Sequence, residues 1–326
     1  MGEALDIQGT FALLNRKFGN IKIKQLNELR PVKDDIVSTG IIGLDIALGV
    51  GGIKKGSIVE IYAPEGAGKT TLALHMCKQF QKDKPVLYID TERTLVRDTV
   101  ESMGIKEKSF YLMHVDNLEM ALEACRTVAQ TGTFSAIVID SLAGLAPEAH
   151  TDRDMGDYRT GLSARIMSDA LPVLTPILDN AKCTLVVITQ LREKADVMFG
   201  NPEKVTGGKA LKYYTSVRLD VRRMESIKQG GEEVGCRTRV KITKSKIAAP
   251  FKSTEFDIMF GHGISVEGDI LDWAVDKGIV GKCGTWYLYE GNRIGQGREK
   301  AKQYLLDNTK ECEKIAIQLR KACGMV

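Results

Sequence analysis

The sequence predicts an α/β fold with a mixed, mostly parallel sheet, on three observations. Short apolar runs recur through the middle of the chain, at residues 58–63, 86–90, 136–140 and 184–190. Helical segments separate these runs, which indicates parallel strands joined by crossovers and covered on both faces. Two later segments, 217–224 and 238–246, alternate in polarity and predict antiparallel strands that extend the sheet. A glycine-rich loop joins the first strand to its helix, as in nucleotide-binding folds of this class.

The composition is that of a soluble globular protein, since 43% of the 326 residues are apolar and 27% are charged. There is neither an apolar stretch of roughly 18 residues, which a membrane span needs, nor a secretion signal at the start. A cytoplasmic protein without membrane contact is therefore expected. The seven cysteines form no C-x-x-C pair, which indicates reduced thiols. The formal net charge of +4 is too small to predict nucleic-acid binding by itself.

The first 33 residues are predicted to form a small N-terminal arm. Apolar side chains at helical spacing between Ile7 and Phe18 predict one helix, and Pro31 should interrupt regular structure beyond it. A large α/β core, residues 34–263, is expected to follow.

A separate C-terminal lobe of mixed helices and strands is predicted at residues 264–326, because the sequence pattern changes after about Gly263. The lobe should contain a hairpin at residues 286–295. It should close with one charged helix from Glu299 to Lys321.

Three of the apolar strands end in polar residues. The sequence reads Asp-Thr-Glu at residues 90–92, Asp-Ser at 140–141 and Thr-Gln at 189–190. In such sheets ligands bind beyond the carboxyl ends of the strands. We therefore expect these three ends to line one crevice.

The loop at residues 63–70 reads APEGAGKT and is typical of a phosphate site. Its glycines let backbone N–H groups turn towards phosphate, and the following helix N-terminus adds positive potential. Lys69 should reach the β- and γ-phosphates, and the Thr70 hydroxyl should bind Mg²⁺. The predicted nucleotide-binding residues of this loop are Glu65, Gly66, Ala67, Gly68, Lys69, Thr70 and Thr71.

Two acidic strand ends supply the other groups expected for hydrolysis. Asp140 can hold Mg²⁺ opposite Thr70, directly or through water. Glu92 is a candidate general base, because hydrolysis needs a carboxylate near the γ-phosphate that is not occupied with the metal. On pattern alone, Glu92 is interpreted equally well as a solvated loop acid.

With these motifs in place, the chain closely resembles the bacterial RecA recombinase family from about residue 10 to about residue 300. The resemblance rests on long blocks, among them STGIIGLDIALGVGG, APEGAGKTTL, VIDSLAGLAP, TGGKALKYYTSVRLDVRR and KIAAPFK. It implies a RecA-type P-loop ATPase core, an N-terminal arm that polymerises onto the neighbouring copy, and a C-terminal lobe that gathers duplex DNA.

The function that this resemblance implies is ATP-dependent homologous recombination. The chain would coat single-stranded DNA as a helical filament, with ATP and Mg²⁺ at the interface between subunits. It would pair that strand with homologous double-stranded DNA, exchange strands and hydrolyse ATP when DNA is bound. Repressor cleavage of the SOS type, and partners such as a repressor and DNA-loading proteins, belong to the same implication.

Site residues carry over where the motifs match. Glu92 looks like the catalytic glutamate and Asp140 like the magnesium-associated aspartate. Gln190 looks like the residue that senses the γ-phosphate and passes its state to the following DNA loop. Phe260 stands where the family has an aromatic against the adenine, and Tyr213 where it has an aromatic at the subunit interface.

Lys244 and Lys246 match the lysines that reach across the interface to the γ-phosphate of the neighbour's ATP. On pattern alone, these two residues are interpreted as a solvated charge run on a strand. Two DNA loops, around residues 155–161 and 192–209, are implied by the same resemblance. Arg239, Lys241, Lys282 and Arg298 match basic positions of a second surface that binds duplex DNA. The residues expected at the single strand are Met155, Gly156, Arg165, Ser168, Arg192, Met198, Phe199, Asn201, Gly207 and Gly208. Met198 and Phe199 are interpreted equally well as buried packing residues.

The chain departs from the family in the DNA loops and at the base. Thr160 and Ala195 are smaller than the apolar side chains that the family inserts between base triplets. Glu193 and Asp196 bring negative charge into a loop that faces phosphates. Thr99 replaces an aromatic, so stacking on the adenine is expected from one side.

Three other functions are alternatives to recombination. A regulator with this fold could bind ATP and polymerise without strand exchange, and the altered second loop keeps this alternative open. A ring-forming motor such as a helicase shares the phosphate loop, but the KIAAPFK and GNPE blocks argue against it. A small-molecule kinase is disfavoured, because nothing in the sequence resembles an acceptor pocket or lid.

Overall fold

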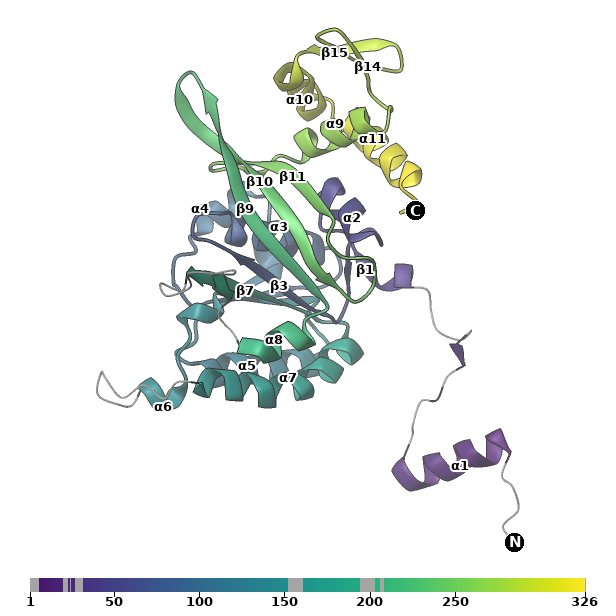
Figure 1. Cartoon of the computed structure of the whole chain (residues 1–326), viewed down its shortest axis with the longest axis vertical. Coiled ribbons are helices and arrows are strands. Elements are labelled where there is room, and N and C mark those ends of the chain that lie inside the picture. Colours follow the sequence, from purple (N-terminus) through teal and green to yellow (C-terminus); the bar gives the residue numbers. More distant parts are fainter. Residues whose placement is uncertain are drawn as a thin grey trace. The chain divides into compact units, whose positions relative to one another are not determined.

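The computed structural model describes residues 6–19, 23, 25, 26, 32–151, 161–193, 203–205 and 208–325 (Figure 1). The chain divides into two units, residues 1–35 and 36–326. In the first unit, helix α1 (Ile7–Phe18) confirms the predicted N-terminal helix. Asp6 caps it by accepting a hydrogen bond from the Gly9 N–H at 2.6 Å. A 3₁₀ helix, η2 (Val32–Asp35), ends this unit.

The second unit is built on a ten-stranded mixed sheet of the described residues, in the order β12-β11-β10-β9-β3-β7-β6-β4-β5, with β8 paired to β7. Its parallel part comprises β3 (Ile58–Ala63), β4 (Val86–Asp90), β5 (Phe110–Met113), β6 (Ala136–Asp140) and β7 (Thr184–Glu193). Its antiparallel part comprises β8 (Glu203–Val205), β9 (Val217–Gln229), β10 (Glu232–Ser245), β11 (Ser253–Met259) and β12 (Gly263–Ile264). The predicted mixed sheet is confirmed. Strand β9 joins the two parts, since it runs parallel to β3 and antiparallel to β10.

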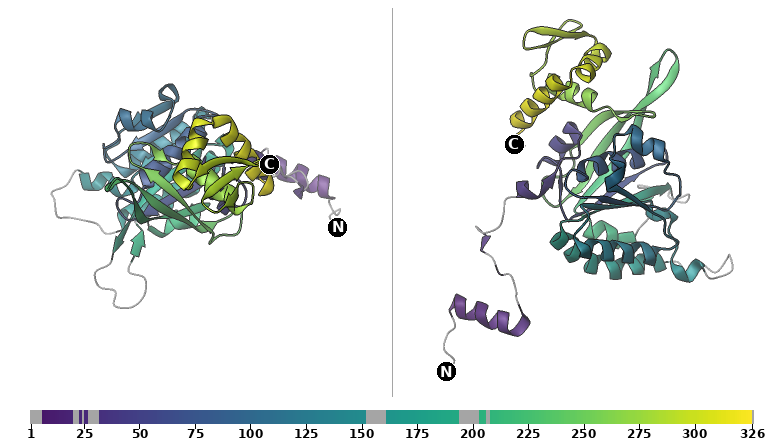
Figure 2. Two further views of the ribbon diagram at one scale, coloured as in Figure 1. Left: turned by 90° about the horizontal axis from the view of Figure 1, so that it is seen from above. Right: turned by 180° about the vertical axis from the view of Figure 1, so that it is seen from behind.

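Helices cover both faces of this sheet, as the apolar strands predicted (Figures 1 and 2). One face carries α2 (Ile42–Leu48), α3 (Lys69–Phe80) and α4 (Arg97–Ser102). The other carries α5 (Leu118–Thr131), α7 (Leu162–Ala181) and α8 (Gly208–Tyr214). Each face has its own apolar cluster, with Leu72 and Met76 in one and Leu122 and Leu174 in the other. A short helix α6 (Glu148–Thr151), a pair of strands β1 (Ile36–Val37) and β2 (Ile53–Lys54), and the 3₁₀ turns η3 (Glu107–Ser109) and η4 (Leu142–Gly144) complete the core.

The segment predicted as the C-terminal lobe belongs to the same unit as the core. It comprises helix α9 (Val266–Asp276), the strands β13 (Gly281–Cys283), β14 (Trp286–Tyr289) and β15 (Asn292–Gln296), and the helices α10 (Arg298–Asp307) and α11 (Thr309–Ala322). The predicted hairpin is β14–β15. The lobe packs on α2 through a third apolar cluster, to which α2 contributes Ile42. In addition, Asp269 at the start of α9 accepts a hydrogen bond from the Gly43 N–H at 3.1 Å.

The prediction of a single helix from Glu299 to Lys321 is wrong, because the helix is interrupted at Asn308. This residue has φ −115° and ψ 66°, outside helical values, and it lies between α10 and α11. Its side-chain amide donates to the Tyr304 carbonyl at 2.9 Å, and its own carbonyl accepts from the Cys312 N–H at 3.1 Å. The Tyr304 carbonyl also accepts from the Asn308 N–H at 2.9 Å, so the side-chain bond adds to the helical bond, and the interruption lies in the backbone dihedral angles of Asn308.

No helix among the described residues combines the length and the apolar character that crossing a membrane requires.

Candidate active site

The phosphate loop joins the end of β3 to the start of α3, in the order the sequence predicted. Gly66 and Gly68 both have positive φ, at +68° and +93°, and Gly68 is the N-cap residue of α3. A Cβ on Gly68 would lie 2.5 Å from Cδ1 of Ile258 in β11. The positive φ therefore favours glycine at this position, and a larger residue would also have to displace the end of the Ile258 side chain.

Lys69 lies half-buried over this loop. Its ammonium donates to the Pro64 carbonyl at 2.8 Å and to the Ala63 carbonyl at 3.4 Å. Burial lowers the pKa of Lys69, while the nearby carboxylates of Asp140 and Glu92 act in the opposite direction. The cation is thus held at the mouth of the loop by neutral oxygens, which an anionic phosphate can replace.

Thr70 and Asp140 lie together, as a shared magnesium site requires. The Thr70 hydroxyl donates to Asp140 Oδ2 at 2.6 Å, and the Tyr88 hydroxyl donates to the same oxygen at 2.6 Å. Burial is the main cause that raises the pKa of Asp140, and both hydrogen bonds oppose it. The oxygen donors fit Mg²⁺, which usually takes one or two protein ligands and completes its shell with phosphate and water.

Glu92 lies at the meeting point of the three polar strand ends. Its Oε1 accepts from the Ser141 hydroxyl at 2.8 Å and from the Gln190 side-chain amide at 3.2 Å. The buried Asp90 carboxylate shapes the loop that carries Glu92, since it accepts from the N–H groups of Glu92 (3.1 Å) and Leu95 (2.9 Å). The three polar strand ends thus meet, as predicted. The roles of Tyr88 and Ser141 were missed, although a tyrosine inside a buried strand is a signal for a hydrogen-bond partner.

Lys244 and Lys246 lie at the carboxyl end of α8. The Lys244 ammonium donates to the carbonyls of Lys212 (2.6 Å) and Tyr213 (2.9 Å), and that of Lys246 donates to the Tyr214 carbonyl (3.3 Å). Lysine is favourable there, because the last carbonyls of a helix lack helical partners. The Tyr213 side chain is 71% exposed beside them.

Phe260 and the candidate DNA residues are spread over several elements. The Phe260 ring is 48% exposed, which leaves a face open to a ligand. Arg165 and Ser168 are exposed on α7, Arg192 lies in β7, and Gly208 begins α8. Six of the residues expected at the single strand lie outside the described residues: Met155, Gly156, Met198, Phe199, Asn201 and Gly207. The same holds for Thr160, Ala195 and Asp196 among the departures, and for Pro31.

The basic residues predicted to bind duplex DNA differ in how far acidic side chains already neutralise their charges. Lys241 is exposed, and the Lys282 ammonium lies 5.0 Å from the centre of the Tyr287 ring. Arg239 pairs with Glu255 at 2.8 Å. Arg298 bonds Asp257 at 2.6 Å and Asp272 at 2.9 Å, so its charge is already balanced where α10 meets α9 and β11. These ion pairs raise the pKa of Arg298.

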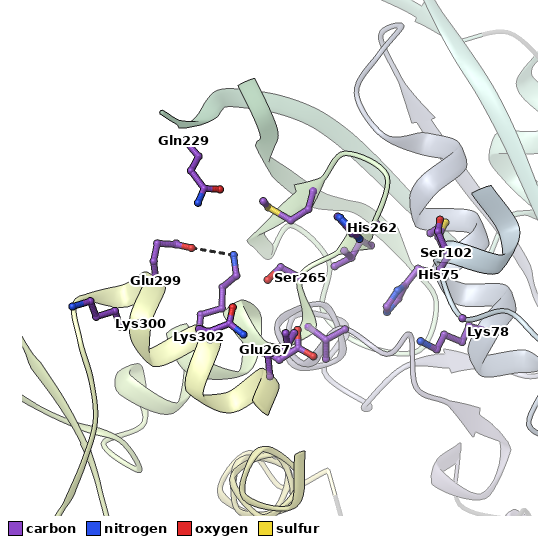
Figure 3. Close-up of a pocket in the computed structure, with 18 residues that line it drawn as sticks. His75, Lys78, Ser102, Gln229, His262, Ser265, Glu267, Glu299, Lys300 and Lys302 are labelled. Atoms are coloured by element: carbon purple, nitrogen blue, oxygen red, sulfur yellow. Dashed lines mark hydrogen bonds and ion pairs between the residues drawn. The ribbon is translucent and has the colours of Figure 1, made fainter. Parts of the chain in front are cut away.

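A pocket of about 640 Å³ lies away from the phosphate loop, between α3 and the C-terminal lobe (Figure 3). His75 and Lys78 of α3 lie on one side of it, and Glu299 and Lys302 of α10 on the other. Burial lowers the pKa of His75 to about 4, so the imidazole is neutral, and Lys302 is paired with Glu299 at 3.2 Å. None of the predicted site residues lines this pocket. Its mixed charges select no ligand class.

The fold and this site define an ATPase of the class in which a phosphate loop joins a parallel strand to a helix. Residues 5–265 match the family described as RecA N-terminal domain, and residues 268–324 match RecA C-terminal domain. The chain is 48% identical over 296 residues to Protein RecA of Clostridioides difficile, covering 90% of this chain and 85% of that protein. It is 44% identical over 325 residues to Protein RecA of Saccharopolyspora erythraea, covering 99% and 93%. The chain therefore belongs to the RecA family.

A crystal structure of the RadB recombinase shares the fold. Its TM-score is 0.53 at 24% sequence identity, with 70% of this chain and 98% of that chain covered. As a RecA-family member, the chain is an ATP-dependent recombinase, and its enzymatic activity is DNA-dependent hydrolysis of ATP. Binding of DNA and formation of filaments belong to this family identity.

Proposed function

We propose that the chain coats single-stranded DNA as a helical filament in which each ATP is held, with Mg²⁺, between two neighbouring copies. The filament pairs its strand with homologous duplex DNA and exchanges strands. The observation that carries this proposal is the meeting of Glu92, Ser141 and Gln190 at one point, beside the phosphate loop and just before the second DNA loop.

Each residue of the crevice has a separate task. Lys69 and the loop N–H groups bind the phosphates, and Thr70 with Asp140 would hold Mg²⁺, which neutralises phosphate charge when bound. Glu92 would accept a proton from the attacking water. Ser141 and Gln190 orient its carboxylate by donating to Oε1. In such chemistry catalysis comes mainly from positioning and electrostatics, so a misplaced group slows turnover strongly.

Lys244 and Lys246 complete the site of the next copy. Their ammonium groups bond neutral carbonyls at the end of α8, and exchange of these for a neighbour's phosphate replaces weak partners by a charged one. Helix α8 begins at Gly208, at the carboxyl end of the second DNA loop. Movement of Lys244 and Lys246 therefore displaces α8, the helix that anchors that loop. The exposed Tyr213 ring supplies contact area at the same interface.

Assembly along the filament uses helix α1. This helix buries none of its own side chains, and Ile7, Leu13 and Phe18 are 73%, 51% and 62% exposed. A helix with such a stripe needs an apolar partner. Between α5 and α7 lies a hollow of about 390 Å³ whose apolar lining is Leu122, Ile166, Ala170, Val173 and Leu174. We place α1 of one copy on this hollow of the next.

DNA contacts are made by the two loops and by basic residues. Arg165, Arg192 and Lys241 act chiefly by releasing counterions from DNA phosphates. Binding should therefore weaken steeply as salt rises. Lys282 of the C-terminal lobe contacts the duplex DNA.

The test is ATP hydrolysis with and without single-stranded DNA, followed by strand pairing on homologous and heterologous duplexes. We expect hydrolysis to rise when the single strand is added, and joint molecules to form only with the homologous duplex. Lys69→Ala, which removes the phosphate cation, is the matched control and should show neither activity. DNA-stimulated hydrolysis without any pairing would instead favour the regulator that polymerises but exchanges no strands.

A further inference from the structure

A charged pair lies buried in the middle of the sheet. Glu60 of β3 and Arg218 of β9 have side chains only 2% and 9% exposed, and the Arg218 Nε–H donates to Glu60 Oε2. The other carboxylate oxygen accepts from the Thr189 hydroxyl of β7 at 3.1 Å. Burial of two charges is costly, and apolar residues of similar volume often stabilise a core as well or better. Stability alone therefore does not account for this pair.

A second set of contacts extends from Arg218 to strand β10. The Arg218 guanidinium lies over the Tyr62 ring, 4.6 Å from the ring centre. The Tyr62 hydroxyl donates to Thr243 Oγ1 at 2.8 Å, and the Thr243 hydroxyl reaches the Arg218 carbonyl at 3.4 Å. We call the five residues Thr189, Glu60, Arg218, Tyr62 and Thr243 the Glu60 line.

The sheet register places this line between the two halves of the proposed site. Glu60 lies opposite Arg218, and Arg218 lies opposite Lys244 in the next strand. Thr189 immediately precedes Gln190, whose amide bonds Glu92. Thr243 immediately precedes Lys244. Thr189, at one end of the line, thus adjoins Gln190, which faces the copy's own ATP. Thr243, at the other end, adjoins Lys244, which faces the ATP of the neighbouring copy.

We infer that Glu60 is a positioning residue that couples consecutive ATP sites along the filament, by keeping Gln190 and Lys244 in register through Thr189 and Arg218. This inference rests on the proposed sharing of ATP between copies. A shift of Lys244 towards a neighbour's phosphate moves β10 relative to β9. The buried pair transmits that shift to β7, because Glu60 is bonded to Arg218 of β9 and to Thr189 of β7 at the same time. Turnover at one site then depends on occupancy of the next.

The readout is the shape of the ATP dependence of turnover on single-stranded DNA. Coupled sites give a sigmoidal curve, and independent sites a hyperbolic one. We expect the wild type to be sigmoidal. The double variant Glu60→Leu/Arg218→Met replaces the pair by apolar residues and should fold, but its curve should be hyperbolic, with saturated turnover reduced by about tenfold. Lys55→Met, which removes the exposed ion pair with Asp83, is the control and should behave as wild type.

A second variant covers the case in which the double variant does not fold. Thr189→Val/Thr243→Val is close in shape and removes only the hydroxyls at the two ends of the line, so it should fold and also lose the sigmoidal shape. A folded variant of either kind that keeps the wild-type curve would overturn the inference, as would a hyperbolic wild type.

Lys244→Ala separates this inference from the proposed function. If Lys244→Ala lowers turnover while the variants of the Glu60 line behave as wild type, the shared site stands and only the coupling fails. If Lys244→Ala turns over ATP normally in the filament, the shared site itself is wrong.

Discussion

The side-chain amide of Gln190 donates a hydrogen bond to Glu92 Oε1 across 3.2 Å. Gln190 lies near the end of β7, and the second DNA loop begins within a few residues of it. The carboxylate proposed as the base is therefore bonded to the strand that leads into the loop. Ser141 holds the same oxygen from the end of β6, so the position of Glu92 depends on two neighbouring strands.

Glu92→Gln should stop hydrolysis and leave DNA-bound assemblies intact. The amide keeps the size of the side chain but cannot take a proton, so turnover should fall at least about 100-fold. ATP-dependent DNA binding should persist, because Lys69 and Thr70 are untouched. Steady-state hydrolysis and electron microscopy of the DNA complex measure the two effects. Glu101→Gln, at an exposed carboxylate of α4, is the control; a normal rate in Glu92→Gln would remove the assignment of the base.

Tyr88→Phe should raise the Mg²⁺ concentration needed for half-maximal hydrolysis. The phenol donates to Asp140 Oδ2 at 2.6 Å, and this bond favours the ionised carboxylate that a cation requires. Its loss also costs about 1 kcal/mol of stability. A Mg²⁺ titration of hydrolysis measures the shift. Tyr304→Phe removes a comparable hydrogen bond to Glu311 in the C-terminal lobe and should leave the titration unchanged.

Gly68→Ala should abolish nucleotide binding and destabilise the fold by more than a positive φ alone explains. Gly132, at the end of α5, is the matched control, since its φ is also positive (+64°) but no atom lies within 4 Å of its would-be Cβ. Gly132→Ala should cost about 1–2 kcal/mol and keep nucleotide binding. Thermal unfolding and binding of a fluorescent ATP analogue distinguish the two variants. Equal losses in both would show that the contact with Ile258 is unimportant.

The unfolding free energy should decline between about pH 4 and pH 7, partly because of Asp269. Burial raises the pKa of this carboxyl from 3.8 to about 7, so the folded protein retains a proton that the unfolded chain releases. The stabilising contribution is complete below the unfolded pKa and is lost as pH rises through about 7. At about 1.4 kcal/mol per pKa unit, it amounts to about 4 kcal/mol at most.

Asp269→Asn cannot ionise, so its unfolding free energy should decline less over the same interval. Urea unfolding at pH 4.5, 6 and 7.5, as approximate test points within that window, compares the variant with wild type. Asp116→Asn, at an exposed carboxyl, should follow the wild type. Parallel curves for Asp269→Asn and wild type would contradict a protonated Asp269 between α9 and α2.

Most of the fold and the nucleotide site could be predicted, because the signals are local. Apolar runs mark strands, and a glycine-rich loop between strand and helix marks the phosphate site. The meeting of residues 90–92, 140–141 and 189–190 followed from a general property of parallel sheets. The prediction of one helix at 299–321 failed because the backbone of Asn308 leaves helical dihedral angles, which the helical pattern on both sides does not reveal.

What could not be predicted depends on contacts between strands that are distant in sequence. Glu60 and Arg218 are 158 residues apart, and no local pattern predicts that they face each other in the core. Tyr88 and Ser141 likewise act through partners on other strands. Sequence resemblance suggested the roles of Lys244 and Lys246, but not their bonds to the end of α8.

The central claim is that one ATP is shared by two copies of the chain and that DNA brings them together. The most direct test is the hydrolysis rate per chain as protein concentration rises, with and without an excess of single-stranded oligonucleotide. We predict a rate per chain that increases with protein concentration and increases further on DNA. A constant rate per chain, unchanged by the oligonucleotide, would contradict the claim.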